Sequence, residues 1–397
     1  MKKVFFMVCT LVAGFMLTSC EQADLTPDGD TTQLWIAGKD GSDLVGFING
    51  SGKMVIPAEL QEAFTFSCGW ALVKANGKYT YINPYGQAAK NVPSTSTFYR
   101  HFYYNLLTFK SGGKLGKWNT NFREVIPAQY YGIGPNTDAG LMWFSNGTKT
   151  GFLNAQGREV IKAQFDYSSS FSDGCCVVGV DQSSGSRQYG VINTQGGYMI
   201  KPQSSPLDNL GQGRIAFYDN NKSEWGFCSS SGQKIISAKY DLISVYSCGL
   251  ALVERNGKYG YIDVNGHEVI EPKYAYAGDF GEDVAWVQET ETSRVELINK
   301  NGVTIMKLKT DEYPQGGFHN GLAYIYNSDT NENSYINKNK QTIYKWTSSG
   351  LYAAPAQQPS LREIGVRALA GTPAGVLLID RQHGISLTEE GEIVYKD

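Results

Sequence analysis

Apolar and polar positions alternate over short stretches of this chain, as strands require. In Lys258–Asp263 large side chains recur at every second position, which is the period of a half-buried strand. Asp263–Gly266 then combines an Asx side chain with a glycine and predicts a turn. The returning strand over Glu268–Glu271 is expected to end at Pro272, because proline cannot donate to a ladder.

Two more strands are expected before this hairpin. Leu250–Val253 is an apolar run of strand length, and Tyr240–Val245 is a less regular fourth candidate. No stretch of the body carries a convincing helical stripe. The body is therefore predicted to be all-β.

This pattern recurs along the chain at a nearly constant step. The positions equivalent to Gly260 follow one another at intervals of 34 to 39 residues. They are Gly46, Thr80, Gly116, Gly151, Gly190, Gly226, Gly260, Glu296 and Ser334. A decayed tenth copy begins at His383. One unit of three or four short strands cannot bury both faces alone, so neighbouring units must stack.

Two architectures fit such an array of about nine to ten units. A β-propeller-like ring protects its strand edges by radial repetition and is favoured. The alternative is an open β-hairpin solenoid, whose ends would need caps. The array is assigned to residues 34–347, and residues 348–397 are expected to form a C-terminal segment with a degenerate repeat or a cap.

The first residues have the features of an export signal. Lys2 and Lys3 precede an apolar run over Val4–Leu17, which is too short for a comfortable membrane span. The run ends in Leu17-Thr18-Ser19-Cys20, which resembles the lipobox of bacterial lipoproteins. That resemblance implies a signal peptide over residues 1–19 and lipidation at Cys20, with several acyl chains holding the protein durably to a membrane.

Residues 20–33 form an acidic, Pro- and Gly-containing stretch that predicts a flexible tether. Acidic residues directly after the cysteine resemble the surface-export signals of Bacteroidota lipoproteins. The expected location is the cell envelope, anchored to the outer membrane, with the cell surface and the periplasm both open as the side it faces.

The repeat itself resembles the WG-repeat (KWG-like) family of bacterial exported proteins. The resemblance covers about Val45 to Tyr344, where an aromatic-Gly-aromatic-Ile-Asp/Asn segment, a turn glycine and Val-Ile-x-Pro recur in order. The literal Trp-Gly pair is found at Trp225-Gly226. The family is described by its repeat and brings no shared catalytic residues.

Composition excludes some partners. The chain of 397 residues has 35 Lys+Arg against 38 Asp+Glu, a formal net charge of −3, so no basic excess exists to displace counterions from nucleic acid. Aromatic residues make up 13% of the chain, and 25 of them are Tyr, which is enough to bury a core.

The sequence offers few candidates for chemistry. After Cys9 and Cys20, an odd number of cysteines and no C-x-x-C remain, which argues against a disulfide framework or a zinc site. These cysteines are Cys68, Cys175, Cys176, Cys228 and Cys248, and they are expected to be small buried side chains. The histidines, none at metal-ligand spacing, are His101, His267, His319 and His383. No metal site, cofactor or catalytic residue is assigned.

Aromatic residues remain open to a functional interpretation. Trp70, Trp143 and Trp286 on one strand, with Trp118 and Trp225 on the next, could form sugar platforms, although packing between units explains their recurrence better. A denser cluster over Phe98–Tyr104, with Arg100 and His101, is a candidate loop for partner contact.

The sequence therefore predicts a membrane-anchored, non-enzymatic binding scaffold with a protein or glycan partner and no nucleic acid. Two alternatives stay open. One is a glycan-active enzyme, which would need two carboxylates at a set separation. The other is a structural subunit of an envelope complex.

Overall fold

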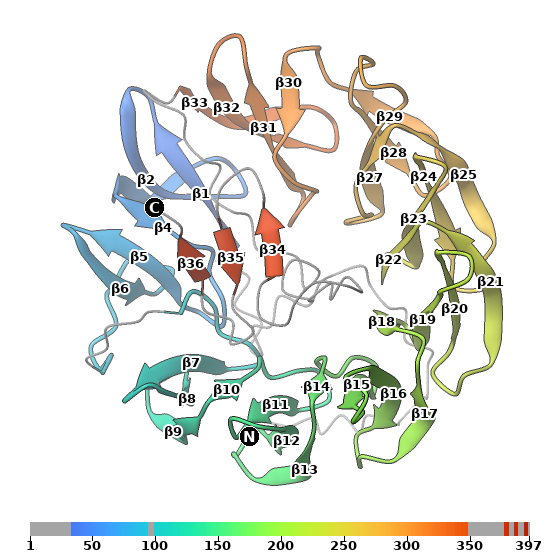
Figure 1. The fold of residues 1–397 in the computed structure, drawn as a ribbon. Coiled ribbons are helices and arrows are strands. Elements are labelled where there is room, and N and C mark those ends of the chain that lie inside the picture. The colour runs from blue at the N-terminus through green and yellow to red at the C-terminus, as the bar shows by residue number, and fades with distance from the viewer. Residues whose placement is uncertain (1–32, 94–98, 348–376, 381–384, 388–392, 396–397) are drawn as a thin grey trace, which may run out of the picture.

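The chain forms a closed ring of nine small antiparallel sheets, a nine-bladed β-propeller (Figure 1). The computed structural model describes residues 33–93, 99–347, 377–380, 385–387 and 393–395. Each of the nine repeat copies forms one blade, and no helix is found among the described residues. The expected all-β, propeller-like architecture is confirmed, and the open solenoid is wrong.

Strands follow one another in chain order within each blade. Blades 1 to 3 contain β1 (Leu34–Lys39), β2 (Ser42–Asn49) and β3 (Met54–Leu60); β4 (Glu62–Ala63), β5 (Ala71–Ala75) and β6 (Lys78–Ile82); β7 (Leu106–Ser111), β8 (Lys114–Asn119) and β9 (Glu124–Tyr130). Blades 4 to 6 contain β10 (Gly132–Ile133), β11 (Leu141–Ser145), β12 (Thr150–Asn154) and β13 (Glu159–Phe165); β14 (Tyr167–Ser168), β15 (Cys175–Asp181), β16 (Arg187–Asn193) and β17 (Tyr198–Gln203); β18 (Leu207–Gly211), β19 (Arg214–Asp219), β20 (Glu224–Ser229) and β21 (Lys234–Tyr240).

The remaining blades follow the same order. Blades 7 to 9 contain β22 (Leu242–Ser247), β23 (Leu250–Arg255), β24 (Lys258–Asp263) and β25 (Glu268–Tyr274); β26 (Tyr276–Ala277), β27 (Val284–Gln288), β28 (Glu296–Asn299) and β29 (Thr304–Lys307); β30 (Glu312–Pro314), β31 (Leu322–Asn327), β32 (Glu332–Asn337) and β33 (Thr342–Thr347). Figure 1 shows the first strand of a four-stranded blade, such as β22, on the inner side of the ring and the fourth, such as β25, on the outer side.

The decayed tenth copy also forms strands. β34 (Leu377–Asp380), β35 (Ile385–Leu387) and β36 (Ile393–Tyr395) pair antiparallel as a separate three-stranded sheet. Whether the C-terminal segment is a degenerate repeat or a cap stays a prediction.

In the blades that carry the repeat glycine, the outermost strand is bulged opposite it. Between the pairs Tyr259↔Tyr274 and Tyr261↔Ile270, β24 advances by two residues and β25 by four. Pro272 lies inside this bulge rather than at the end of the strand, which corrects the expected boundary. A bulge leaves residues unpaired, so proline costs no ladder hydrogen bond there.

The bulge explains why the repeat carries glycine. A Cβ on Gly260 would lie 2.5 Å from the Ile270 carbonyl oxygen and 2.5 Å from the Pro272 nitrogen. All six blades with glycine at this position have two register shifts between third and outermost strands. Blades 8 and 9, with Glu296 and Ser334, have one. Glycine and the wide bulge therefore occur together.

The residue after this glycine position packs across the junction to the next blade. It is fully or almost fully buried in every blade. At five junctions it forms a ring pair with the next blade's innermost segment, with centroid separations of 4.6 to 6.2 Å. These pairs are Phe47–Phe66, Tyr81–Phe102, Phe152–Phe171, Phe227–Tyr246 and Tyr261–Phe280. We call these facing positions the junction pair, and they hold the blades together.

Blade 9 closes the ring on blade 1 mainly through side chains, beside one backbone hydrogen bond from the Gly41 amide to the Thr347 carbonyl at 3.2 Å. In blade 2 the carbonyls of Leu72 and Lys74 accept the amides of Phe64 and Gln61, on the inner side of the blade. The equivalent residues of blade 1 are Ile36 and Gly38, and β1 is the innermost strand of that sheet.

Two tyrosines of blade 9 supply the missing donors. Tyr335 Oη donates to the Ile36 carbonyl at 2.8 Å, and Tyr344 Oη donates to the Gly38 carbonyl at 3.0 Å. Asp40 Oδ1 also accepts the Thr347 amide at 2.8 Å, a hydrogen bond that lowers the pKa of Asp40. Hydroxyl donors thus take the place of strand amides at the closure.

Replacing Gly260 by alanine should destabilise the protein by about 1–3 kcal/mol, because backbone atoms of β25 occupy the place of the new methyl group. Ser334→Ala, at the same repeat position without the wide bulge, should change stability by less than about 0.5 kcal/mol. Urea unfolding of both variants checks this. Equal losses would show that the contact with the bulge is not what requires glycine.

Tyr335→Phe should cost about 1–3 kcal/mol, because the Ile36 carbonyl would lose its hydroxyl donor in a buried position. Tyr326→Phe is the matched control, since its hydroxyl donates to Asn331 on an exposed hairpin, and it should cost less than about 0.5 kcal/mol. Thermal unfolding measures both. If the two variants behave alike, the hydroxyl is not important for closure.

Candidate functional site

One face of the ring carries the tight turns between the first and second strands of the blades. Their first residue has φ of 45° to 54° and their second 65° to 82°, so both are left-handed, as in a type I′ turn. We call the first residues the turn rim; they are Cys68, Tyr104, Asp173, Gln212, Cys248, Glu282 and Asn320. The blades follow one another in the same orientation, so these turns lie on the same face. The backbone conformation of these turns is the same, whereas the side chain of the first residue varies among the blades.

Side chains of the turn rim bond to the turn of the next blade. Asp173 accepts the Gln212 amide, and Glu282 Oε1 accepts the Gly321 amide at 2.9 Å. Lys338 Nζ lies 3.0 Å from Glu282 Oε2. Cys248 Sγ likewise accepts the Asp283 amide, at 3.5 Å. The first position of these turns therefore links neighbouring blades at three places around the ring.

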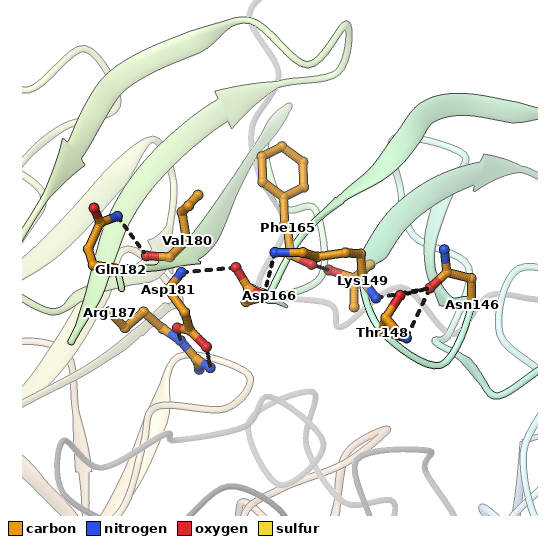
Figure 2. A network of polar contacts seen from close by, with 10 residues as sticks. Asn146, Thr148, Lys149, Phe165, Asp166, Val180, Asp181, Gln182 and Arg187 are labelled. Atoms are coloured by element: carbon orange, nitrogen blue, oxygen red, sulfur yellow. Dashed lines mark hydrogen bonds and ion pairs between the residues drawn. The ribbon is translucent and has the colours of Figure 1, made fainter. Parts of the chain in front are cut away.

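The opposite face has a different polar contact between blades. Figure 2 shows Asp166, in the linker between β13 and β14, with Lys149 on one side and Asp181 on the other. Lys149 Nζ lies 2.6 Å from Asp166 Oδ1, and the Asp181 amide donates to Oδ2 at 2.9 Å. Arg187 in turn binds Asp181 through two nitrogens. The hydrogen bond from Lys149 is the main cause that lowers the pKa of Asp166.

This linker contact recurs. Gln61 accepts the Gly77 amide at 2.6 Å and Asp241 accepts the Asn256 amide at 2.8 Å, in the same places of blades 2 and 7. Repetition identifies these side chains as structural ties between a linker and the next hairpin turn.

The aromatic cluster proposed for partner contact lies largely in the interior. Tyr99 and Phe102 are 9% and 3% exposed, and Phe98 lies outside the described residues. Phe102 is the junction-pair residue of blade 3, equivalent to Phe66. The segment is therefore part of the regular repeat, and the prediction of a partner loop is wrong for Tyr99 and Phe102.

Two of the tryptophans pack between blades. Trp70 and Trp286 are on second strands or beside them, and their Nε1 donates to carbonyls of the next blade, at Thr120 and Gly316. The interpretation as packing between units is confirmed for these two residues. Trp118 instead stacks on Phe109 of its own blade, with centroids 4.6 Å apart. Trp143 and Trp225 are half-buried.

The cysteines and histidines occupy separate places. Cys175, Cys176 and Cys228 are buried free thiols, whereas Cys68 is half-buried and Cys248 is half-buried and disulfide-bonded. The expectation of a small buried side chain thus holds for Cys175, Cys176 and Cys228 and fails for Cys68 and Cys248. Among the described residues no group of three or more His, Cys, Asp or Glu side chains could hold a metal ion.

His267 is a solvent-exposed turn residue, as expected, and its Nδ1 lies 3.0 Å from Asp263 Oδ2. His101 is half-buried, and burial lowers its pKa to about 4. Its Nδ1 has no hydrogen-bond partner. His319 is half-buried on the turn rim side of blade 9. His383 and the lipidation candidate Cys20 lie outside the described residues.

Lys117 is the residue that the sequence analysis missed. It is 0% exposed at the junction-pair position of β8, where the other eight blades have an aromatic or aliphatic side chain. Burial lowers its pKa to about 7. The repeat alignment could have indicated its burial, because Lys117 follows Gly116 as the buried Tyr261 follows Gly260.

Four segments of the chain match the family of WG containing repeats, over residues 46–79, 151–182, 225–259 and 259–291. No curated protein matches the chain. No helix among the described residues is long and apolar enough to cross a membrane.

Solved structures share the fold. A crystal structure of "the eukaryotic initiation factor" is 10% identical, with 79% of this chain and 96% of that chain covered and a TM-score of 0.55. Apo AztD from Citrobacter koseri is also 10% identical, with 80% and 95% covered and a TM-score of 0.40. A streptogramin B lyase structure is 16% identical, with 72% and 95% covered and a TM-score of 0.32. Likeness at this level of identity concerns the fold alone.

Asp166→Asn should lower stability by about 1 kcal/mol at pH 7, because the ion pair with Lys149 is lost. The folded-state pKa of this carboxyl is lowered, so its stabilisation is present above about pH 3.8 and is lost as pH falls further. The difference from wild type should therefore shrink as pH falls below about 4.

Urea unfolding at several pH values measures this difference. Asp241→Asn is the control, because Asp241 makes the equivalent amide contact without an ion pair. It should cost less than Asp166→Asn at pH 7. A loss for Asp166→Asn that does not change with pH would contradict the electrostatic explanation.

Proposed function

We propose that this protein is a lipid-anchored binding scaffold of the bacterial cell envelope. Cys20 would carry the acyl chains, residues 20–33 would serve as a tether, and the propeller would present one face to a protein or glycan partner. The outer membrane is the proposed site of anchoring.

The observation that carries the proposal is the turn rim. One backbone conformation is repeated around a face of the ring, while its first residue changes from Cys to Tyr, Asp, Gln, Glu and Asn. A rigid frame with variable side chains on surface turns is how repeat proteins build extended binding surfaces. Bonds from Asp173, Cys248 and Glu282 to the turn of the next blade keep this part of the surface ordered.

The lipobox-like segment and the fold support separate parts of this proposal. Leu17-Thr18-Ser19-Cys20 favours anchoring, and the propeller with WG repeats is consistent with a scaffold. No catalytic role is assigned to any residue.

Anchoring is tested by metabolic labelling with a fatty-acid analogue and by protease shaving of intact cells. The wild type should incorporate label and Cys20→Ala should not. Cleavage of the wild type without lysis would place the propeller at the cell surface, and protection until lysis would place it in the periplasm. An unlabelled wild type would refute lipidation.

Binding is tested separately, with a photo-crosslinking residue placed at Asp173, at Asn320 or, as the control, at Val269. Val269 is 42% exposed on the outermost strand of blade 7, away from the rim. The two rim positions should crosslink to a common partner in intact cells and Val269 should not. Equal crosslinking at all three positions would count against the rim as the binding face.

A further inference from the structure

The junction between blades 3 and 4 is built differently from the other described junctions. Its junction pair consists of Lys117 on β8 and Asn136 on the innermost segment of blade 4. Asn136 is equivalent to Phe66 because each lies two residues after an amide with the same role in its blade. The Gly134 amide donates to the Trp143 carbonyl, as the Phe64 amide donates to the Leu72 carbonyl. An amine and a carboxamide thus stand where other junctions have apolar side chains.

Both side chains are buried with few partners. Lys117 is 0% exposed and donates to Thr108 Oγ1 at 2.7 Å. Asn136 is 6% exposed, its Nδ2 donates to the Tyr104 carbonyl at 3.5 Å, and its buried Oδ1 has no partner. A buried polar group that lacks its full set of hydrogen bonds destabilises the folded state, whereas the ring pairs at the other junctions stabilise it.

No opposite charge compensates Lys117 in the described part of the chain. Burial is the one influence on its pKa, which falls to about 7. The elements against β8 carry several other titratable groups, of which the carboxylates are exposed and none bonds to Lys117. These groups are Lys110 on β7, Glu124 and Tyr130 on β9, Tyr131 and Asp138 beside β10, and His101, Tyr103 and Tyr104 on the inner segment of blade 3.

Apolar contacts still cross this junction. Ile126 of β9 approaches Gly157 of blade 4 so closely that a Cβ there would lie 3.1 Å from it. Ile133 and Phe144 belong to one buried cluster with Leu115. The junction is therefore closed in the native state, with the polar pair as its weak point.

We propose that the ring opens at the junction between blades 3 and 4, and that the amine of Lys117 sets how often it opens. Opening returns Lys117 to water, where it recovers its ordinary pKa of 10.5. Between pH 7 and 10.5 the open form then binds one more proton than the closed form. Each unit of falling pH in this range favours opening about tenfold. Below pH 7 both forms hold the proton, and Lys117 adds nothing further.

The test is amide hydrogen exchange of the full-length protein at pH 7, 8 and 9, expressed as protection factors. This range lies above the titration of His101. The Gly134 amide, which donates to the Trp143 carbonyl at 2.8 Å, reports on blade 4. The Gly278 amide, which donates to the Trp286 carbonyl at 2.9 Å, is its equivalent at the junction of blades 7 and 8.

Gly134 should be less protected than Gly278 at pH 7, and its protection should rise about tenfold per pH unit. In Lys117→Met, protection of Gly134 should rise at least tenfold at pH 7 and become independent of pH. Tyr261→Lys should weaken the junction between blades 7 and 8. The protection of Gly278 should then fall, with little effect on Gly134.

Three results would overturn the proposal. They are equal protection at the two glycines of the wild type, a pH dependence that survives in Lys117→Met, and a gain in that variant that is the same in every blade. If Lys117→Met does not fold, the wild-type pH series at Gly134 decides alone. A flat series would then reject the role of Lys117.

Discussion

The close approach of two backbones inside the six glycine-bearing blades governs much of this structure. The third strand comes so near the bulged outermost strand that a Cβ on Gly260 would overlap β25. Glycine removes the clash, and the bulge bends and twists the outer strand. The next residue along, Tyr261, is then fully buried and meets Phe280 of the following blade. One steric condition therefore shapes the blade and orients the contact that joins it to its neighbour.

The sequence predicted the repeated parts of this fold well. Nine copies of one pattern gave nine blades because alternation, turn glycines and strand propensity all act locally. The boundary at Pro272 was misplaced, because a bulge inside a strand leaves no periodic signal and proline is usually a strand terminator. The repeat pattern did not predict how the ring closes. Tyr335 and Tyr344 are ordinary aromatic residues of the repeat, and their role is visible only when the fold brings them to the Ile36 and Gly38 carbonyls.

The functional residues were harder to predict, for two different physical reasons. The aromatic cluster around Phe102 looked like an insertion, because the residues before it break the repeat, yet Phe102 itself is a regular core residue. Lys117 was overlooked because lysines are usually exposed, and only its register in the repeat shows that it must be buried. In both cases alignment of equivalent positions was more informative than local composition.

The closure by tyrosine hydroxyls has a consequence for biosynthesis. Blade 1 leaves the ribosome first, but the donors for its Ile36 and Gly38 carbonyls lie 299 and 306 residues further along the chain. During translation blade 1 therefore has an incomplete inner edge, which is a site for wrong strand pairing. These two carbonyls receive their donors only once the ninth blade has been made, so the first sheet to be made is among the last to be finished.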